Sequence, residues 1–347
     1  MTIREIADIA GVSRGTVDRV LHARGRVREE VEKHVWTVAR QCGYVPNRAG
    51  QALAMRKDGK KIGAALSVGN NPFFLPIVEG MRDAQREYED YSISLDVRYL
   101  HTHDAKEQVQ IIDELVAEKI DALILIPIED EAVQRKIKSL IQRGLPVVTL
   151  NSDCKDSGRL TYVGCDYLQS GRAAGHLMNL LAACVRRICV VVGSRRSICH
   201  AERLRGFSEI CRSRAGQAPI IDVVESDDND EVAYARLCEK LSAQPDTDAF
   251  YFAAGGVRGG LAAVRDAALP GSKPTIITMD ETAAVVEAIR DDFVAATISQ
   301  EPHRQGYEAV CAAANAVINR SHEVVPDIIV HNNIIMKYNL PSQRAST

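Results

Sequence analysis

Residues 2–21, TIREIADIAGVSRGTVDRVL, carry the strongest structural signal in the chain. Small and apolar residues recur there at helical spacing, first at Ile6, Ala7 and Ala10 and then at Val17, Val20 and Leu21. Gly11 interrupts the pattern with a backbone that turns easily, and Ser13 is a favoured residue at the start of a following helix. The stretch therefore predicts two short helices joined by a tight turn, the arrangement called helix-turn-helix.

The exposed side of the second predicted helix is suited to reading DNA. The residues that it presents outward are Arg14, Gly15, Thr16, Asp18 and Arg19. A guanidinium near a helix N-terminus can bind guanine through two hydrogen bonds in the major groove. A third helix is expected over residues 28–42, with its valines facing the other two. A plain three-helix bundle whose arginines are only solvated is the alternative interpretation.

The charge of the 347-residue chain is unevenly distributed. The total of 43 Lys and Arg against 46 Asp and Glu gives a net charge of −3, which is ordinary for a globular protein. Residues 1–61 hold 13 basic and 7 acidic side chains, whereas residues 62–347 hold 30 and 39. A basic head on an acidic body indicates that the head meets nucleic acid or an acidic membrane surface, unless the clustering is accidental.

Several classes of protein are disfavoured by the same sequence. The first ten residues include charges and no run of 18 apolar residues occurs, so we expect a cytoplasmic protein with no signal peptide and no membrane partner. The nine cysteines lack CxxC and Cys/His spacing, which predicts reduced thiols and no metal site. The glycines at 255–260 fail the dinucleotide fingerprint and no GxxxxGK loop is present, so we expect no cofactor and no enzyme.

From residue 62 onward, short strand-like runs alternate with amphipathic helical stretches. The runs are IGAALSV, SISLDVRYL, ALILIP, PVVTL, ICVVVG, IIDVVE, AFYFAA and TIITMD. Such alternation predicts βαβ units, and hence an α/β core with parallel sheets flanked by helices. About 280 residues exceed what one open sheet of this kind needs, so two similar lobes are expected.

Polar and aromatic side chains follow several of the predicted strands. Ligands of open α/β sheets bind beyond the carboxyl ends of the strands. The candidate effector-binding residues there are Asn71, Phe73, Phe74, Asn151, Asp153, Arg203, Gly255, Asp280 and Gln300. Amides, carboxylates, one guanidinium and aromatic plates suit a small, largely uncharged polyhydroxylated ligand. The alternative is that the two phenylalanines belong to a lobe core and that the two aspartates cap helices.

Residues 2–57 resemble the DNA-binding head of the LacI-type bacterial transcription regulators, through TIREIADIAGVSRGTVDRVL and GYVPNRAGQALAMRK. The resemblance implies a helix-turn-helix head over residues 1–46, then a hinge helix and linker over residues 47–61. The DNA-binding residues that we assign on this basis are Thr2, Ser13, Arg14, Gly15, Thr16, Arg19, His22, Arg26, Arg28, Asn47, Arg48 and Leu53.

The family resemblance gives these contacts different roles. Family members read bases at Arg14, Gly15 and Arg19, and the residue at Leu53 enters the minor groove and kinks the duplex. Because Gly15 has no side chain, base choice at that position should depend on the two arginines. Asp18 stands where the family often has a small hydroxyl, so it should weaken a phosphate contact locally.

Residues 62–338 resemble the periplasmic sugar-binding fold, with the closest pattern in its ribose-binding branch. The matches to ligand residues of that branch are NNPFF at 70–74, Arg203, Asp280 and Gln300. The departures are Asn151 in place of Asp, Met279 in place of an aromatic residue and Gly255 in place of Asn. The resemblance therefore implies a sugar or polyol effector without identifying it.

Together these observations predict a sequence-specific transcriptional regulator, expected to be a repressor, whose affinity for double-stranded operator DNA is modulated by the effector. The core is expected over residues 62–340, with an N-lobe of 62–164 and 300–325, a C-lobe of 165–299 and 326–340, and a tail of 341–347. A homodimer is expected, and the tail lacks heptads for further association. A sugar-binding transport component and a dinucleotide-dependent enzyme are the alternatives.

Overall fold

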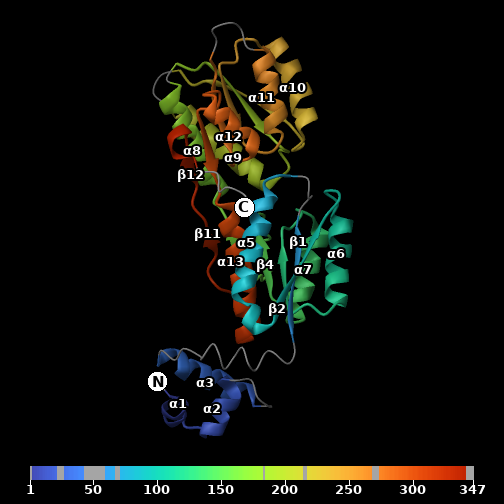
Figure 1. Cartoon of the computed structure of the whole chain (residues 1–347), viewed down its shortest axis with the longest axis vertical. Coiled ribbons are helices and arrows are strands. Elements are labelled where there is room, and N and C mark those ends of the chain that lie inside the picture. The colour runs from blue at the N-terminus through green and yellow to red at the C-terminus, as the bar shows by residue number, and fades with distance from the viewer. Residues whose placement is uncertain are drawn as a thin grey trace.

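A small helical head and two α/β lobes make up the computed structural model of the chain (Figure 1). The structure describes residues 2–21, 27–42, 59–66, 71–182, 184–213, 217–267 and 273–340. The head lies at one end of the long axis beside the N-terminal lobe, and the C-terminal lobe lies at the other end. Within these residues, no helix combines the length and apolar character needed to cross a membrane.

The head contains three helices, α1 (Ile3–Ala10), α2 (Arg14–Leu21) and α3 (Glu29–Gln41). Gly11 ends α1 in the left-handed region, with a φ of 65°. The Thr16 amide donates a 3.1 Å hydrogen bond to Ser13 Oγ, so Ser13 caps the start of α2. The residues fully buried among the three helices are Ile6, Val17 and Val35. The predicted helix-turn-helix and third helix are confirmed.

The N-terminal lobe is a parallel sheet with helices on both faces. Its strands are β1 (Lys60–Leu66), β2 (Ile93–Tyr99), β3 (Ala122–Leu125), β4 (Val147–Leu150), β5 (Thr161–Gly164) and β11 (Ile328–Ile329). Their order is β11-β5-β4-β3-β1-β2, and all neighbours are parallel. One face is covered by α5 (Phe74–Glu87) and α13 (Pro302–Asn319), the other by α6 (Ala105–Ala117) and α7 (Glu131–Gln142). A 3-10 turn, Glu89–Tyr91, follows α5.

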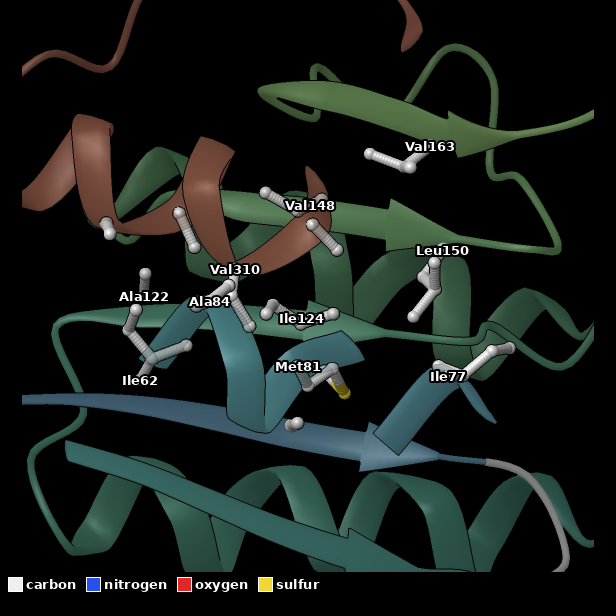
Figure 2. Close-up of a cluster of buried hydrophobic side chains, with 14 of the residues drawn as sticks. Ile62, Ile77, Met81, Ala84, Ala122, Ile124, Val148, Leu150, Val163 and Val310 are labelled. Atoms are coloured by element: carbon white, nitrogen blue, oxygen red, sulfur yellow. The ribbon is translucent and has the colours of Figure 1, made fainter. Parts of the chain in front are cut away.

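Figure 2 shows the core between this sheet and the helices α5 and α13. Ile62 and Ile124 come from the sheet, Met81 from α5 and Val310 from α13, and all four are completely buried. Burying side chains of this size contributes roughly 1.5–3 kcal/mol each. This packing fixes the start of α5, and with it the predicted aromatic pair, at the carboxyl edge of the sheet.

The C-terminal lobe repeats the same arrangement. Its strands are β6 (Arg187–Val192), β7 (Ile220–Glu225), β8 (Ala249–Phe252), β9 (Thr275–Met279), β10 (Ala296–Ser299) and β12 (Asn333–Ile335), in the order β12-β10-β9-β8-β6-β7. Only β12 is antiparallel to its neighbour among these described strands. One face is covered by α8 (Tyr167–Leu181) and α9 (Ile198–Arg212), the other by α10 (Asp230–Ala243), α11 (Val257–Ala267) and α12 (Ala283–Arg290). A 3-10 turn, Lys337–Asn339, follows β12.

Each of the eight predicted runs contains a strand, which confirms an α/β core of two similar parallel-sheet lobes. One boundary was wrong. The prediction placed residues 326–340 in the C-lobe, but Ile328 pairs with Val163 of the N-terminal sheet. The last crossing between lobes therefore lies between Ile329 and Asn333. A two-residue strand has no periodicity of its own, so its sheet is decided only by contact with β5.

Candidate effector site and nucleic-acid interface

The candidate effector residues with polar side chains come from both lobes, at the carboxyl ends of the strands. Asp280 follows β9 and Gln300 follows β10, while Arg203 lies on α9 in the C-lobe. Asn151 directly follows β4 in the N-lobe. The Tyr167 hydroxyl of α8 donates a hydrogen bond to the Asn151 carbonyl, so the two lobes are in contact at this edge.

The buried Gln300 amide and the partly buried Asp280 carboxylate are paired in the C-lobe. Gln300 is 2% exposed, and its Nε2 donates to both carboxylate oxygens of Asp280, at 2.8 and 3.0 Å. The Cys165 thiol donates to Gln300 Oε1 at 3.2 Å. The side-chain Nε2 of Gln305 in turn donates to the backbone carbonyl of Gln300 at 2.8 Å. The side chain of Gln300 is therefore held by partners on two other segments, Asp280 and Cys165, and its backbone by Gln305.

Burial raises the pKa of the Asp280 carboxyl to about 6, although the Arg203 guanidinium and the Gln300 amide both favour its charged form. The carboxylate is therefore mostly ionised at neutral pH and becomes protonated in mildly acidic solution. An ionised carboxylate only accepts hydrogen bonds, which suits it to the hydroxyl groups of a ligand.

Arg203 is a buried cation with unused hydrogen-bonding capacity. Arg203 is 5% exposed, and its Nη1 donates to the Ala253 carbonyl at 2.8 Å. The guanidinium carbon lies 4.9 Å from the centre of the Tyr167 ring. Among the described residues, Arg203 Nε finds no hydrogen-bond partner. A buried charged donor without a partner is costly, so it marks a position where a ligand oxygen would be favourable.

Close packing of α8 against α9 puts Arg203 in this position. A Cβ on Gly171 of α8 would lie 2.0 Å from the Arg203 carbonyl oxygen, and a Cβ on Gly206 of α9 would lie 2.2 Å from the Leu168 carbonyl oxygen. The two backbones can approach so closely only because both positions lack a side chain. The ring of Tyr167, in the first turn of α8, consequently lies beneath the Arg203 guanidinium.

Asn151 is the N-lobe partner of these residues. Its backbone is left-handed, with a φ of 59°, and its backbone N–H donates to the Val163 carbonyl at 2.8 Å. Its side-chain Nδ2 lies 3.5 Å from Gln305 Oε1, which is a weak contact. Asn151 therefore has most of its side-chain hydrogen-bonding capacity left for a ligand.

The aromatic segment forms the other N-lobe contribution. Asn71 Oδ1 accepts a 3.0 Å hydrogen bond from the Phe73 amide, which shapes the turn into α5. Phe73 and Phe74 pack edge to face, with ring centres 5.3 Å apart. Phe74 is 8% exposed and belongs to the lobe core, whereas Phe73 is only partly buried. Of the two predicted aromatics, Phe73 has the more accessible ring.

Asp153 is bonded within the N-lobe. Its carboxylate accepts hydrogen bonds from the Thr149 hydroxyl and the Cys154 amide, both at 2.8 Å, and from the Arg159 guanidinium. Arg159 also binds Asp327, at 2.7 Å. This network stabilises the segment after β4 and leaves Asp153 less available to a ligand than the aspartate at 280.

Gly255 is adjacent to an acidic residue that sequence reasoning missed. Its amide donates to Asp228 Oδ1 at 2.7 Å, and a Cβ at Gly255 would lie 2.9 Å from the same oxygen. Asp228 follows β7 at the carboxyl edge of the sheet, so its position in sequence was an available signal. Because glycine has no Cβ, Gly255 leaves room for the Asp228 carboxylate beside the candidate effector residues.

A second missed residue connects the lobes directly. Glu129, which follows β3 in the N-lobe, accepts a 2.8 Å hydrogen bond from the Ile198 amide at the start of α9. Ser197, the residue before this helix, contributes no side-chain cap. A carboxylate from one lobe therefore satisfies a helix N-terminus in the other.

The candidate DNA-binding residues of the head lie on and around α2. Arg14, Gly15 and Arg19 are exposed, while Ser13 Oγ and Thr16 Oγ1 lie 2.9 Å apart. Arg19 Nε donates to the Gly15 carbonyl at 3.0 Å, so its guanidinium lies along the helix surface. The polar side chains of Ser13, Thr16 and Arg19 therefore contact one another along α2.

Of the other residues that we assigned to DNA binding, two lie in the described part of the chain and the rest lie outside it. Thr2 forms a reciprocal cap with Glu5 at the start of α1, and Arg28 is exposed just before α3. The assigned residues that lie outside the described part of the chain are His22, Arg26, Asn47, Arg48 and Leu53. The hinge helix and linker predicted over residues 47–61 also lie outside it, apart from residues 59–61, of which Lys60 and Lys61 already belong to β1.

A helix-turn-helix head joined to a two-lobed core, with candidate effector residues contributed by both lobes, defines a class, the DNA-binding transcriptional regulators that respond to a small molecule. Residues 62–321 match the periplasmic binding protein domain family, and residues 2–47 match the bacterial regulatory proteins of the lacI family. The chain therefore belongs to the periplasmic binding protein domain family and carries the DNA-binding head of the lacI family.

Individual relatives fit both parts. The HTH-type transcriptional regulator CelR of Thermobifida fusca is 28% identical over 273 residues, 76% of each chain. The ribose import binding protein RbsB of Escherichia coli is 27% identical over 263 residues, 75% of this chain and 84% of its own. The crystal structure of GanP, a glucose-galactose binding protein from Geobacillus stearothermophilus, superposes with a TM-score of 0.72 at 24% identity, covering 82% of this chain and all of that one.

Proposed function

We propose that this regulator binds a small, neutral sugar or polyol between its lobes and that the bound molecule changes its affinity for operator DNA. The observation that carries the proposal is the buried Arg203 Nε without a partner, beside the ionisable Asp280 carboxylate. A donor and an acceptor at fixed positions suit a pair of hydroxyl groups. The similarity to sugar-binding proteins supports this ligand class.

The proposed ligand contacts divide between hydrogen bonds and stacking. Arg203, Asp280 and Asn151 would bind hydroxyl groups, with Gln300 orienting the carboxylate. Phe73 would cover an apolar face of the ring. Phe74 and Asp153 are assigned supporting roles, because the first is part of the core and the second is bonded to Arg159. Asn71 shapes the turn that presents Phe73, and Gly255 keeps the site open beside Asp228.

The site is tested by isothermal titration calorimetry against D-ribose, D-xylose, D-galactose, D-glucose and myo-inositol. Arg203→Met should weaken binding of the sugar that the wild type binds by about 100-fold, because a buried charge-assisted contact is lost. The matched control is Arg205→Met, two residues along α9, where the side chain is exposed and paired with Glu202. An unchanged dissociation constant in Arg203→Met would remove Arg203 from the site.

We further propose that the head binds operator DNA as a homodimer, in the cytoplasm, and acts as a repressor without catalysing a reaction. A dimer places two recognition helices in successive major grooves, which matches half-sites about one helical turn apart. The exposed face of α2 supports base readout by Arg14 and Arg19, with phosphate contacts from Ser13 and Thr16.

Fluorescence anisotropy on DNA flanking the protein's own gene tests the DNA-binding part, with salt varied at each step. Arg14→Ala should cost about 1–3 kcal/mol and relax preference at one base position. Arg4→Ala, an exposed arginine on α1, is the matched control. Binding that does not weaken with salt would contradict the phosphate contacts. Sedimentation velocity on the free and DNA-bound protein tests the dimer.

A further inference from the structure

Tyr167 contacts candidate ligand residues of both lobes at once. It is the first residue of α8, three positions after β5 ends at Gly164 and the chain crosses into the C-lobe. Its ring lies under the Arg203 guanidinium, with 4.9 Å between the guanidinium carbon and the ring centre. Its hydroxyl donates to the carbonyl of Asn151 in the N-lobe. One side chain therefore joins the C-lobe cation to the N-lobe residue that faces it.

The chemistry of both contacts is stable over the working pH range. Burial raises the pKa of the Tyr167 hydroxyl well above 10, so it keeps its proton and remains a donor. The Arg203 guanidinium is always charged, and a desolvated cation over an aromatic face is attracted to the ring. The contacts of Tyr167 therefore depend on geometry, because neither Tyr167 nor Arg203 changes its charge over this pH range.

A neighbouring tyrosine provides an internal comparison. The Tyr162 hydroxyl, from β5, has one hydrogen to donate and lies 2.9 Å from the same Asn151 carbonyl oxygen and 3.2 Å from the Cys165 carbonyl oxygen. Tyr162 lies on β5 and Asn151 directly follows β4, so the bond between them lies within the N-terminal lobe. The bond from Tyr167 reaches the same oxygen from α8, in the other lobe.

We propose that Tyr167 is a positioning residue that couples occupancy of the site to the arrangement of the lobes. The inference rests on the proposed function, because it assigns a role in that site's regulation. A ligand oxygen on Arg203 Nε would draw the guanidinium toward the ligand and change its contact with the ring. Because the Tyr167 hydroxyl is bonded to Asn151, a shift of the ring is transmitted to the N-lobe, which leads to the DNA-binding head. The effector site and the DNA-binding head are then coupled through Tyr167, which contacts a residue of each lobe.

The test compares Tyr167→Phe with Tyr162→Phe in the full chain. Each variant removes one hydroxyl from the same carbonyl and keeps the ring, so both lose a hydrogen bond of similar kind. Operator affinity is measured by anisotropy with and without D-ribose, and with the other four compounds of the calorimetric panel. The ratio of the two dissociation constants is the coupling factor, and calorimetry gives the affinity for the added compound separately.

In Tyr167→Phe we expect the coupling factor to fall at least fivefold toward one, while the affinity for the added compound stays within about threefold of wild type. In Tyr162→Phe we expect the coupling factor to be retained. A second variant, Tyr167→Leu, also removes the ring under Arg203 and should weaken binding of the added compound as well. Small-angle X-ray scattering of the ligand-free proteins should show a larger radius of gyration in Tyr167→Phe only.

The outcomes separate the two proposals. A wild-type protein whose operator affinity responds to a panel compound, together with an unchanged coupling factor in Tyr167→Phe, overturns the role of Tyr167 alone. Equal losses of coupling in Tyr167→Phe and Tyr162→Phe overturn it too, because general weakening at Asn151 would then explain the effect. A wild-type protein that binds none of the five compounds overturns the proposed ligand class, and the coupling role with it.

Discussion

The two lobes share one strand order and differ in what they bury at the carboxyl ends of their strands. The N-lobe pairs its buried charges internally, since Arg159 binds both Asp153 and Asp327. The C-lobe leaves Arg203 Nε without a partner among the described residues and raises the pKa of Asp280. In one lobe the charges stabilise the fold, and in the other they belong to the site that we propose for the effector. In the proposed site, the charged contacts would therefore come from the C-lobe and the stacking contact of Phe73 from the N-lobe.

The largest expected difference between the lobes concerns stability. Arg159→Met should lower the free energy of unfolding by roughly 2–4 kcal/mol, because Asp153 keeps a carboxylate in a part-buried site without its cation. Arg203→Met should change it by less than about 1 kcal/mol, because the lost cation was incompletely paired. Urea unfolding followed by circular dichroism measures both. Equal destabilisation by the two variants would break the comparison.

Replacing a glycine at a close helix–helix contact should lower the free energy of unfolding by a similar amount in the two lobes. Gly171→Ala puts a Cβ 2.0 Å from the Arg203 carbonyl oxygen, and Gly80→Ala on α5 puts one 1.9 Å from the His303 carbonyl oxygen. Each should cost roughly 1–3 kcal/mol of stability, since backbone must move. Only Gly171→Ala should also weaken effector binding, because α9 carries Arg203. Gly15→Ala, which meets no backbone, is the control for the substitution itself. Effector binding weakened equally by Gly80→Ala would contradict the division between lobes.

The pH dependence should reflect Asp280. Its folded pKa of about 6 lies above the ordinary value of 3.8, so the folded protein holds this proton more tightly than the unfolded chain does. The contribution to stability is therefore complete below about pH 4 and is lost as pH rises to about 6. Asp280→Asn should remove this loss, amounting to roughly 1–3 kcal/mol above pH 7. Parallel pH profiles of unfolding for the variant and the wild type would show that Asp280 titrates normally.

The smallest expected effect concerns the contact between lobes at Glu129. Glu129→Ala removes the acceptor of the Ile198 amide and should cost about 0.3–1 kcal/mol at that helix end. Hydrogen exchange should accelerate at the first turn of α9 and not elsewhere in the C-lobe. Glu131→Ala is the matched control, since that carboxylate is paired with Arg135 within α7. Unchanged exchange at the first turn of α9 would mean that the cap contributes nothing in solution.

Much of the fold could be predicted because its signals are local. The helix-turn-helix follows from apolar spacing around Gly11, and the eight strands follow from short apolar runs. Strand β5 was missed because Thr161 and Gly164 leave only two consecutive apolar residues in it. Strands β11 and β12 were not predicted, because their two and three residues show no period that differs from a loop. The assignment of residues 326–329 failed for that reason.

The candidate site was predictable to the extent that strand ends meet at one edge. Arg203, Asp280 and Gln300 could be selected by that rule, and the structure brings them close together. Tyr167 and Glu129 could not be selected, because their significance depends on residues of the other lobe. The ion pair that occupies Asp153 also depends on Asp327, which lies 168 residues beyond Arg159 in the chain.

The sequence by itself determined the class of this protein, since periodicity, turn residues and charge distribution are properties of neighbouring residues. It also determined which side chains reach the carboxyl edges of the sheets. Only the tertiary structure decided which of these charges are already paired and which lack a partner. Pairing depends on distances between segments far apart in sequence, and burial changes the energy of a charge only after those segments have packed. Asp153 and Asp280 illustrate the point, because similar positions after strands lead to an ion pair with Arg159 in one lobe and to a carboxylate with a raised pKa in the other.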